Sequence, residues 1–231
     1  MMGKDVHRYD PLPTDTYIIF PYFVTENDFR LLEPSEIKEN YPRGWEYLLE
    51  NKDTLSKRER GRYQGKYFYA FSRPQNMTEY TKPKILTPEI SYGTNMTLDR
   101  EGAFYHTTKV YSFVFKENQK EAPEYWLGLL NSKVLWFFIK NTGYTLRGGY
   151  FTFKTNYLSP FPIPTIDFNN PDMVEKHDRI VELVKTMLTI KADKHIYRSS
   201  LFDERLFFLE KQIEDIIFEI YGIPRNWEKI F

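Results

Sequence analysis

Cysteine is absent from all 231 residues, and this absence excludes disulfide bonds, thiolate nucleophiles and cysteine-ligated metal sites. No apolar run approaches the roughly 18 residues that a membrane-spanning helix needs, and no charged-then-apolar leader opens the chain. We therefore expect a cytoplasmic protein without membrane contact. Net charge is also lacking, since 32 basic residues balance 32 acidic ones.

Motifs of several catalyst classes are missing too. The chain has no glycine-rich loop for S-adenosylmethionine, no (N/D)PP(Y/F) element, no GxxxxGK(S/T) phosphate loop and no nucleophile elbow. The four histidines (His7, His106, His177, His195) do not share the spacing of metal ligands. We expect no catalytic residue, metal or cofactor in this chain alone.

What is present is a large apolar content, 41% hydrophobic with 18% aromatic residues, which is ample for a core. β-Branched and aromatic segments bounded by turn residues predict strands. These segments are 16–23, 66–71, 84–90, 109–116 and 150–153. Two short helical pieces are expected within 34–50. Pro123 is suited to the first position of a helix that runs to about residue 141 and is apolar on nearly every side, which predicts burial.

The pattern changes after Pro164, where apolar residues recur at helical spacing through residues 171–222. Ser200 with Asp203 resembles a helix-capping box, and Gly222 before Ile223-Pro224 is a helix stop. The prediction is an α+β protein. Residues 1–165 form a mixed-sheet domain with a buried helix, and residues 166–231 form a two-helix hairpin.

Charge is distributed unevenly along the chain. Residues 51–85 hold nine basic and three acidic residues, and residues 125–166 hold no acidic residue at all. A basic face that contacts phosphates would have this pattern. An ordinary fluctuation of charge along a solvated surface explains it equally well at this point.

The ordered series of motifs resembles a known family. The chain carries GKDVHRY, IIFPY, YPRGWEYLLENKDTLSKR, RP, KPKILTPEIS, YWLGLLNSKVLWFFIK, RGGYFTFKTNYLSPFPIP and IEDIIFEIYGI. In this order they resemble the C-terminal target-recognition region of TaqI-like adenine-specific DNA methyltransferases, including type IIG restriction–modification and BREX-type enzymes. The resemblance covers nearly the whole chain.

The resemblance implies a double-stranded DNA recognition module without its catalytic half. In the family, an upstream methyltransferase domain binds S-adenosylmethionine and flips the target adenine, and GKDVHRY follows that domain. Methylation by this chain alone is therefore not expected. The helical hairpin would serve as a spacer or would dock onto the catalytic domain.

The resemblance assigns no residue to phosphate contact, so the candidates are chosen by the chemistry of their side chains. Phosphates are bound by Lys, Arg and backbone amides, and the segment LSKRERGRYQGK is dense in these residues. A solvated helix end is the alternative for this segment. The candidates are Lys57, Arg58, Arg60, Arg62, Lys66, Lys84, Arg147 and Lys154.

Base reading needs forked or bidentate groups on a rigid element. The candidates are Arg73, Tyr92, Thr94, Asn95 and Arg100. Arg147 stands beside Gly148-Gly149, which predicts a tight hairpin turn with the arginine at its tip. Because this motif belongs to the shared pattern, a phosphate contact is favoured over base reading, and an ion pair with the helical region is the structural alternative.

Two further interpretations stay open. The aromatic residues Phe68, Tyr69, Phe71, Phe151 and Phe153 could stack on single-stranded bases, but alternating core positions explain them more simply. The helix pair could be a protein-interaction module, and a nuclease is the less favoured enzyme alternative.

Overall fold

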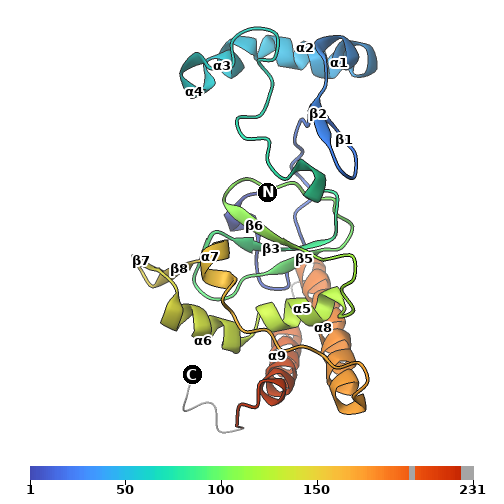
Figure 1. The fold of residues 1–231 in the computed structure, drawn as a ribbon, viewed down its shortest axis with the longest axis vertical. Helices are drawn as coiled ribbons and strands as arrows, with labels where there is room; N and C mark the ends of the chain where they lie inside the picture. The colour runs from blue at the N-terminus through green and yellow to red at the C-terminus, as the bar shows by residue number, and fades with distance from the viewer. Residues whose placement is uncertain (198–200, 225–231) are drawn as a thin grey trace. The chain divides into compact units, whose positions relative to one another are not determined.

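The computed structural model describes residues 1–197 and 201–224, and its contacts divide the chain into two compact units (Figure 1). The first unit joins residues 1–14 to the segment from residue 83 onward, and the second comprises residues 15–82. Helices and antiparallel strands are both present, so the α+β class is confirmed. The division into domains at 1–165 and 166–231 stays a prediction.

The first unit contains two small antiparallel sheets in place of one mixed sheet. The central strand β3 (Lys84–Pro88) lies between β5 (Thr97–Asp99) and β6 (Val110–Val114). The second sheet has the order β4 (Ile90–Ser91), β8 (Tyr150–Thr152), β7 (Thr145–Leu146). The strands predicted at 84–90, 109–116 and 150–153 are thus confirmed, with the first divided at Glu89.

Helices cover these sheets. They are η1 (Gly3–Asp5), α5 (Pro123–Leu130), α6 (Lys133–Thr142), α7 (Thr155–Leu158), α8 (Pro171–Tyr197) and α9 (Leu201–Ile220). The single helix predicted at 123–141 is divided at Asn131 and Ser132. The break is stabilised because the Ser132 hydroxyl accepts a hydrogen bond from the Leu135 backbone and caps α6.

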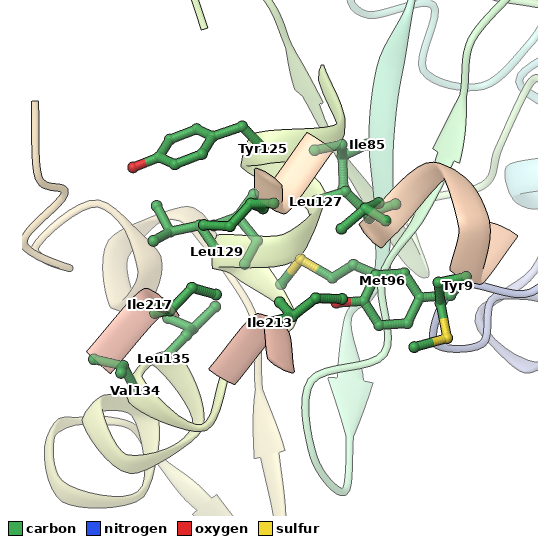
Figure 2. Close-up of a cluster of buried hydrophobic side chains, with 14 of the residues drawn as sticks. Tyr9, Ile85, Met96, Tyr125, Leu127, Leu129, Val134, Leu135, Ile213 and Ile217 are labelled. Carbon is green, nitrogen blue, oxygen red and sulfur yellow. The ribbon is translucent and has the colours of Figure 1, made fainter. Parts of the chain in front are cut away.

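The core of this unit forms where α5 packs between the sheet and the C-terminal helices (Figure 2). Tyr125, Leu127 and Leu129 of α5 are fully buried, which confirms the predicted burial. Gly128 allows the close approach of α8, because a β-carbon there would lie 3.0 Å from Ile180 Cγ2. The C-terminal hairpin therefore shares one core with the sheet.

The two long C-terminal helices predicted within 171–222 are confirmed as α8 and α9, which pack on one another. Gly222 ends α9 in the left-handed region (φ 66°), and the Ile223 amide donates to the Phe218 carbonyl. This is the predicted helix stop. The predicted cap at Ser200 lies outside the described residues.

The second unit is built from short elements around a small core. They are β1 (Tyr22–Val24), β2 (Phe29–Leu31), α1 (Pro34–Asn40), α2 (Pro42–Glu50), α3 (Lys52–Ser56), α4 (Arg58–Gly61) and η2 (Met77–Glu79). The core consists of Ile37, Leu48, Phe68 and Tyr69. The two short helices predicted within 34–50 are confirmed as α1 and α2.

Two predicted strands of this unit are wrong. Of segment 16–23, only Tyr22 and Phe23 lie in a strand, and Tyr17 is 92% exposed without a pairing strand beside it. Segment 66–71 is a series of turns in which Phe68 and Tyr69 are both buried, so its side chains do not alternate. Aromatic composition predicted both strands, but composition does not provide a neighbouring strand to pair with.

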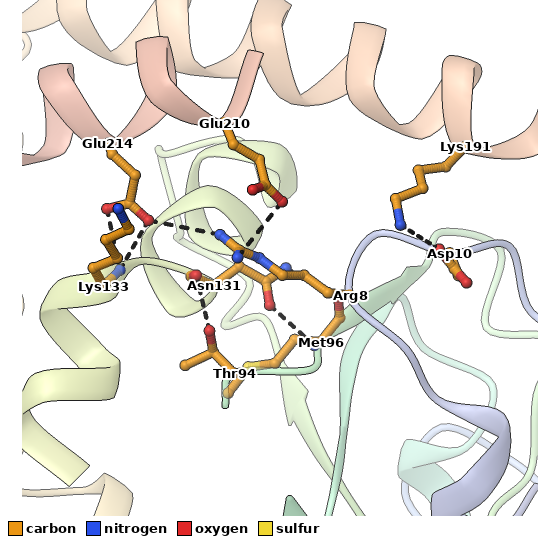
Figure 3. A network of polar contacts seen from close by, with 9 residues as sticks. All are labelled: Arg8, Asp10, Thr94, Met96, Asn131, Lys133, Lys191, Glu210 and Glu214. Carbon is orange, nitrogen blue, oxygen red and sulfur yellow. Dashed lines mark hydrogen bonds and ion pairs between the residues drawn. The ribbon is translucent and has the colours of Figure 1, made fainter. Parts of the chain in front are cut away.

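A partly buried polar network joins the N-terminal segment to the C-terminal helices (Figure 3). Arg8 lies 3.5 Å from Glu210 and 3.6 Å from Glu214, and Lys191 pairs with Asp10 at 2.8 Å. The Lys133 amide donates to Glu214 at 2.9 Å. Burial raises the pKa of the Glu214 carboxyl to about 7, against the attraction of Arg8.

Glu214→Gln is expected to flatten the pH dependence of stability between about pH 4.5 and 7. A carboxyl whose pKa is higher in the folded state binds more protons there, so the free energy of unfolding falls as pH rises, by at most about 1.4 kcal/mol per pH unit. Urea unfolding at several pH values measures this slope. Glu204→Gln, at an exposed position of α9, is the control and keeps it; equal slopes for the parent chain and Glu214→Gln would contradict the prediction.

In the part of the chain that the structure describes, no helix is both long and apolar enough to cross a membrane.

Candidate functional site

The basic loop, defined as residues 57–66, carries five cationic residues and one acidic residue. Lys57, Arg60 and Arg62 are exposed, and none has an ion pair or side-chain hydrogen bond among the described residues. The backbone is left-handed at Glu59 (φ 50°) and Arg60 (φ 60°), a conformation that costs energy in non-glycine residues. The loop therefore presents cations to solvent from an unusual turn.

Arg58 has a different role from the predicted phosphate contact. Its guanidinium donates to the carbonyls of Leu55, Phe68 and Ala70 at 2.8, 2.7 and 2.9 Å. The bonds to Phe68 and Ala70 satisfy two carbonyls of segment 66–71 that a neighbouring strand would otherwise bind. Arg58 holds the basic loop onto the core of its unit.

Two further phosphate candidates have internal partners. Lys84 is fully buried within β3 and lies 2.5 Å from Asp99, so it is not accessible to a phosphate and that prediction is wrong. Lys66 is exposed but pairs with Glu33. Its partner reduces the charge that it offers to a ligand.

A hairpin surface forms at the turn between β7 and β8, and it comprises Tyr92, Arg147 and Tyr150. Gly148 and Gly149 both have positive φ (83° and 78°), as the predicted tight turn requires. Arg147 is exposed at the turn and has no ion pair among the described residues. The rings of Tyr92 and Tyr150 lie 6.0 Å apart, and Tyr92 packs against Gly149.

The five candidates for base reading differ in the exposure of their side chains and in the contacts that these side chains make. Arg73 is exposed and its side chain has no partner in the described part of the chain, while Tyr92 is 66% exposed. Thr94 is buried and donates to the Asn131 carbonyl at 2.9 Å, so it anchors its loop instead of reading bases. Asn95 donates to Ser91, and Arg100 pairs with the buried Glu124.

Asn131 ties the loop after β4 to the helices through hydrogen bonds. Its side chain accepts from the Met96 amide and donates to the Met96 carbonyl, both at 3.0 Å (Figure 3). This buried residue stands at the break between α5 and α6. It fixes the loop that carries Tyr92 to the helices beneath it.

Lys154, the remaining phosphate candidate, borders a pocket of about 390 Å³ that the sequence did not reveal. Its ammonium lies 3.3 Å from Glu89, which also pairs with Lys109 at 2.8 Å. The hydrogen bond from Lys109 holds the pKa of the Glu89 carboxyl below its usual value. Nothing in the segment TPEI marks Glu89 as a site residue, because its partners are distant in sequence.

The aromatic candidates for stacking are mostly core residues. Phe68, Tyr69, Phe151 and Phe153 are between 0% and 7% exposed, and Phe71 is half-buried. This confirms the core interpretation for four of the five. Among the residues that the structure describes, no three His, Asp or Glu side chains are grouped so that they could hold a metal ion.

Comparison with known proteins identifies relatives of the chain. The sequence profile of the TaqI-like C-terminal specificity domain matches residues 1–163. The type II restriction enzyme and methyltransferase RM.Eco57I of Escherichia coli is 25% identical over 228 residues, covering 94% of this chain and 23% of that protein.

Two methyltransferases are similar as well. The type II methyltransferase M.HindII of Haemophilus influenzae is 30% identical over 160 residues, which cover 67% of this chain and 31% of that protein. The type II methyltransferase M.BanIII of Aneurinibacillus aneurinilyticus is 25% identical over 189 residues, which cover 80% and 30%. The chain therefore spans less than a third of the length of each of these three relatives.

Proposed function

This chain belongs to the TaqI-like C-terminal specificity domain family, and we propose that it is the duplex-DNA recognition module of a restriction–modification DNA methyltransferase. A methyltransferase domain upstream of it would bind S-adenosylmethionine and modify adenine at N6 in the cytoplasm. This chain would grip the duplex and select the site. Two relatives, a type II restriction enzyme and methyltransferase and a type II methyltransferase, support the assignment to a restriction–modification system.

The observation that carries the proposal is a set of exposed cations that the fold leaves unpaired. Among the described residues, Lys57, Arg60, Arg62, Arg73 and Arg147 are exposed without an ion pair. Unpaired cations release the counterions of DNA when they bind its phosphates, and this release drives binding. Cations already paired within the protein, such as Lys66 and Lys154, contribute less.

The roles of these cations divide by location. We assign Lys57, Arg60, Arg62 and Arg147 to phosphates, because they are exposed on turns and have no ion pair among the described residues, which suits positioning contacts. Arg73 and the exposed ring of Tyr92 remain for base reading. The buried or paired candidates then serve to hold these elements in place.

A second candidate function, docking onto a protein partner through the helical hairpin, is favoured by one observation. Phe207 and Phe208 of α9 are 71% and 64% exposed, and large apolar side chains at adjacent exposed positions suit a protein interface. Replacing both by serine would abolish partner binding and leave DNA binding intact if docking is the main function.

Arg147→Gln tests the assignment of the hairpin turn. A phosphate contact predicts equal weakening, about 3-fold to 10-fold, on every duplex sequence, and a slope of log K against log [salt] that is smaller by about 0.9. Anisotropy titrations on several duplexes measure both quantities. Arg179→Gln on α8 is the matched control and is expected to change neither. Weakening on one sequence only would instead assign Arg147 to base reading.

A further inference from the structure

A pocket opens beside the hairpin surface, lined by Glu89, Ile90, Tyr144, Leu146, Thr152 and Tyr157, with Lys154 and Asn156 completing it. Its volume of about 390 Å³ is within the range of pockets that hold small organic ligands. All of its residues come from β4, β7, β8, α7 and the short segments beside them, which form one unit of the chain. None of the roles assigned above uses this pocket.

Its walls suit a flat ring. Tyr144 is 59% exposed and Tyr157 is half-buried, so both offer ring surface, while Ile90 and Leu146 add aliphatic contacts. Aromatic side chains beside apolar ones are the usual environment of an unstacked base in a protein.

The polar groups of the pocket favour particular bases. Glu89 is ionised at neutral pH because Lys109 and Lys154 pair with it, so it only accepts hydrogen bonds. A carboxylate of this kind accepts from the exocyclic amine of cytosine or adenine. Thr152 is 6% exposed, and its buried hydroxyl has no hydrogen-bond partner in the described structure. Such a group is costly unless a ligand or water satisfies it.

Two lysines surround Glu89: Lys154, which lines the pocket, and Lys109, which pairs with Glu89 from outside the lining. Lys109 and Lys154 outnumber the single carboxylate of Glu89, and their side chains are 68% and 47% exposed. A nucleotide phosphate would lie on these ammonium groups while its base entered the pocket.

We propose that this pocket binds one unstacked nucleotide whose base carries an exocyclic amino group, cytosine or adenine. The source is either a nucleotide displaced from bound DNA or a free nucleotide, since both present the same chemistry. The first source rests on the proposed function, because it requires duplex binding; the second does not.

Three binding measurements test the pocket: a paired duplex, the same duplex with one bulged cytosine or one bulged thymine, and free dCMP against dTMP. For a displaced nucleotide we expect the cytosine bulge to bind about tenfold more tightly than the paired duplex, from one base stack. The thymine bulge should gain less than the cytosine bulge. Preference for dCMP over dTMP without a preference for bulged DNA supports the pocket with a free nucleotide as ligand.

Tyr144→Leu is the informative variant, and Tyr47→Leu, at an exposed tyrosine of α2, is its matched control. Tyr144→Leu is expected to remove the preference for the cytosine bulge or for dCMP and to leave paired-duplex affinity unchanged; Tyr47→Leu should change neither. Thr152→Val should reduce the same preference without lowering the unfolding midpoint, because its hydroxyl has no partner to lose.

Two failures are distinguishable. Salt-sensitive binding of paired duplex without preference for the cytosine bulge or for dCMP overturns the pocket and leaves the proposed function in place. Absence of duplex binding overturns the proposed function, and the dCMP arm then decides the pocket: selective binding supports it, and no binding overturns it.

Discussion

Lys84→Met is expected to lower the free energy of unfolding by about 3–5 kcal/mol, because it leaves a buried carboxylate without its cation. Lys84 and Asp99 are both fully enclosed, and their side-chain atoms lie 2.5 Å apart between the neighbouring strands β3 and β5. Asp99 also accepts from the Ala103 and Phe104 amides at 3.0 Å each. Those two bonds do not replace the charge that the substitution removes.

The double variant Lys84→Met with Asp99→Asn separates this mechanism from simple loss of packing. Asparagine is neutral and keeps an oxygen that can accept from an amide, so we expect the double variant to recover more than half of the lost stability. Urea unfolding followed by tryptophan fluorescence measures all three chains.

A surface pair provides the control. Lys176→Met removes the partner of the exposed Asp172, which lies one helical turn away from the half-buried Lys176, and should cost less than about 0.5 kcal/mol. If Lys84→Met lowers the free energy of unfolding by no more than Lys176→Met does, the predicted contribution of the buried pair to stability is contradicted.

Replacing Lys57, Arg60 and Arg62 together by glutamine is expected to weaken duplex binding by about 500-fold near 0.1 M salt, relative to an affinity that is unchanged at about 1 M salt. Each lost phosphate contact removes about 0.9 from the slope of log K against log [salt], so the three together remove about 2.7. The expected loss follows from that change of slope. The fold should persist, because these side chains are exposed and unpaired, whereas Arg58, which holds the loop, is unchanged.

Net charge alone could produce part of such a loss, and a matched triple variant measures that part. Lys38, Arg43 and Lys185 are exposed cations outside the predicted set, and their replacement by glutamine changes the formal charge equally. This control should lose no more than a few-fold in affinity, from the general field of the protein. Equal losses in both triple variants would mean that the basic loop is not a contact surface.

The elements that could be predicted from sequence are those with local signals. Helical periodicity located α8 and α9, Pro34 and Pro42 began α1 and α2, and Gly148-Gly149 marked the turn between β7 and β8. Each of these signals lies within the element that it predicts. The shared series of motifs then indicated the family.

The errors arose where a distant residue decides the outcome. Lys84 is the last residue of a KPK sequence, which is typical of an exposed segment, but its partner Asp99 is on another strand, so its burial has no local sign. Segment 66–71 has strand composition, yet the guanidinium of Arg58 replaces the neighbouring strand. Glu89 and the pocket depend on contacts with Lys109 and Lys154 that only the folded chain brings together.

The salt dependence of binding to a mixed-sequence duplex tests the central claim most directly. If Lys57, Arg60, Arg62 and Arg147 contact phosphates as assigned, log K should fall with log [salt] with a slope of about −3.6. Anisotropy titrations between about 50 and 200 mM NaCl would then show a loss of affinity of about 150-fold. A flat salt dependence, or no binding at micromolar protein in the lowest salt, would contradict the account of this chain as a DNA-recognition module.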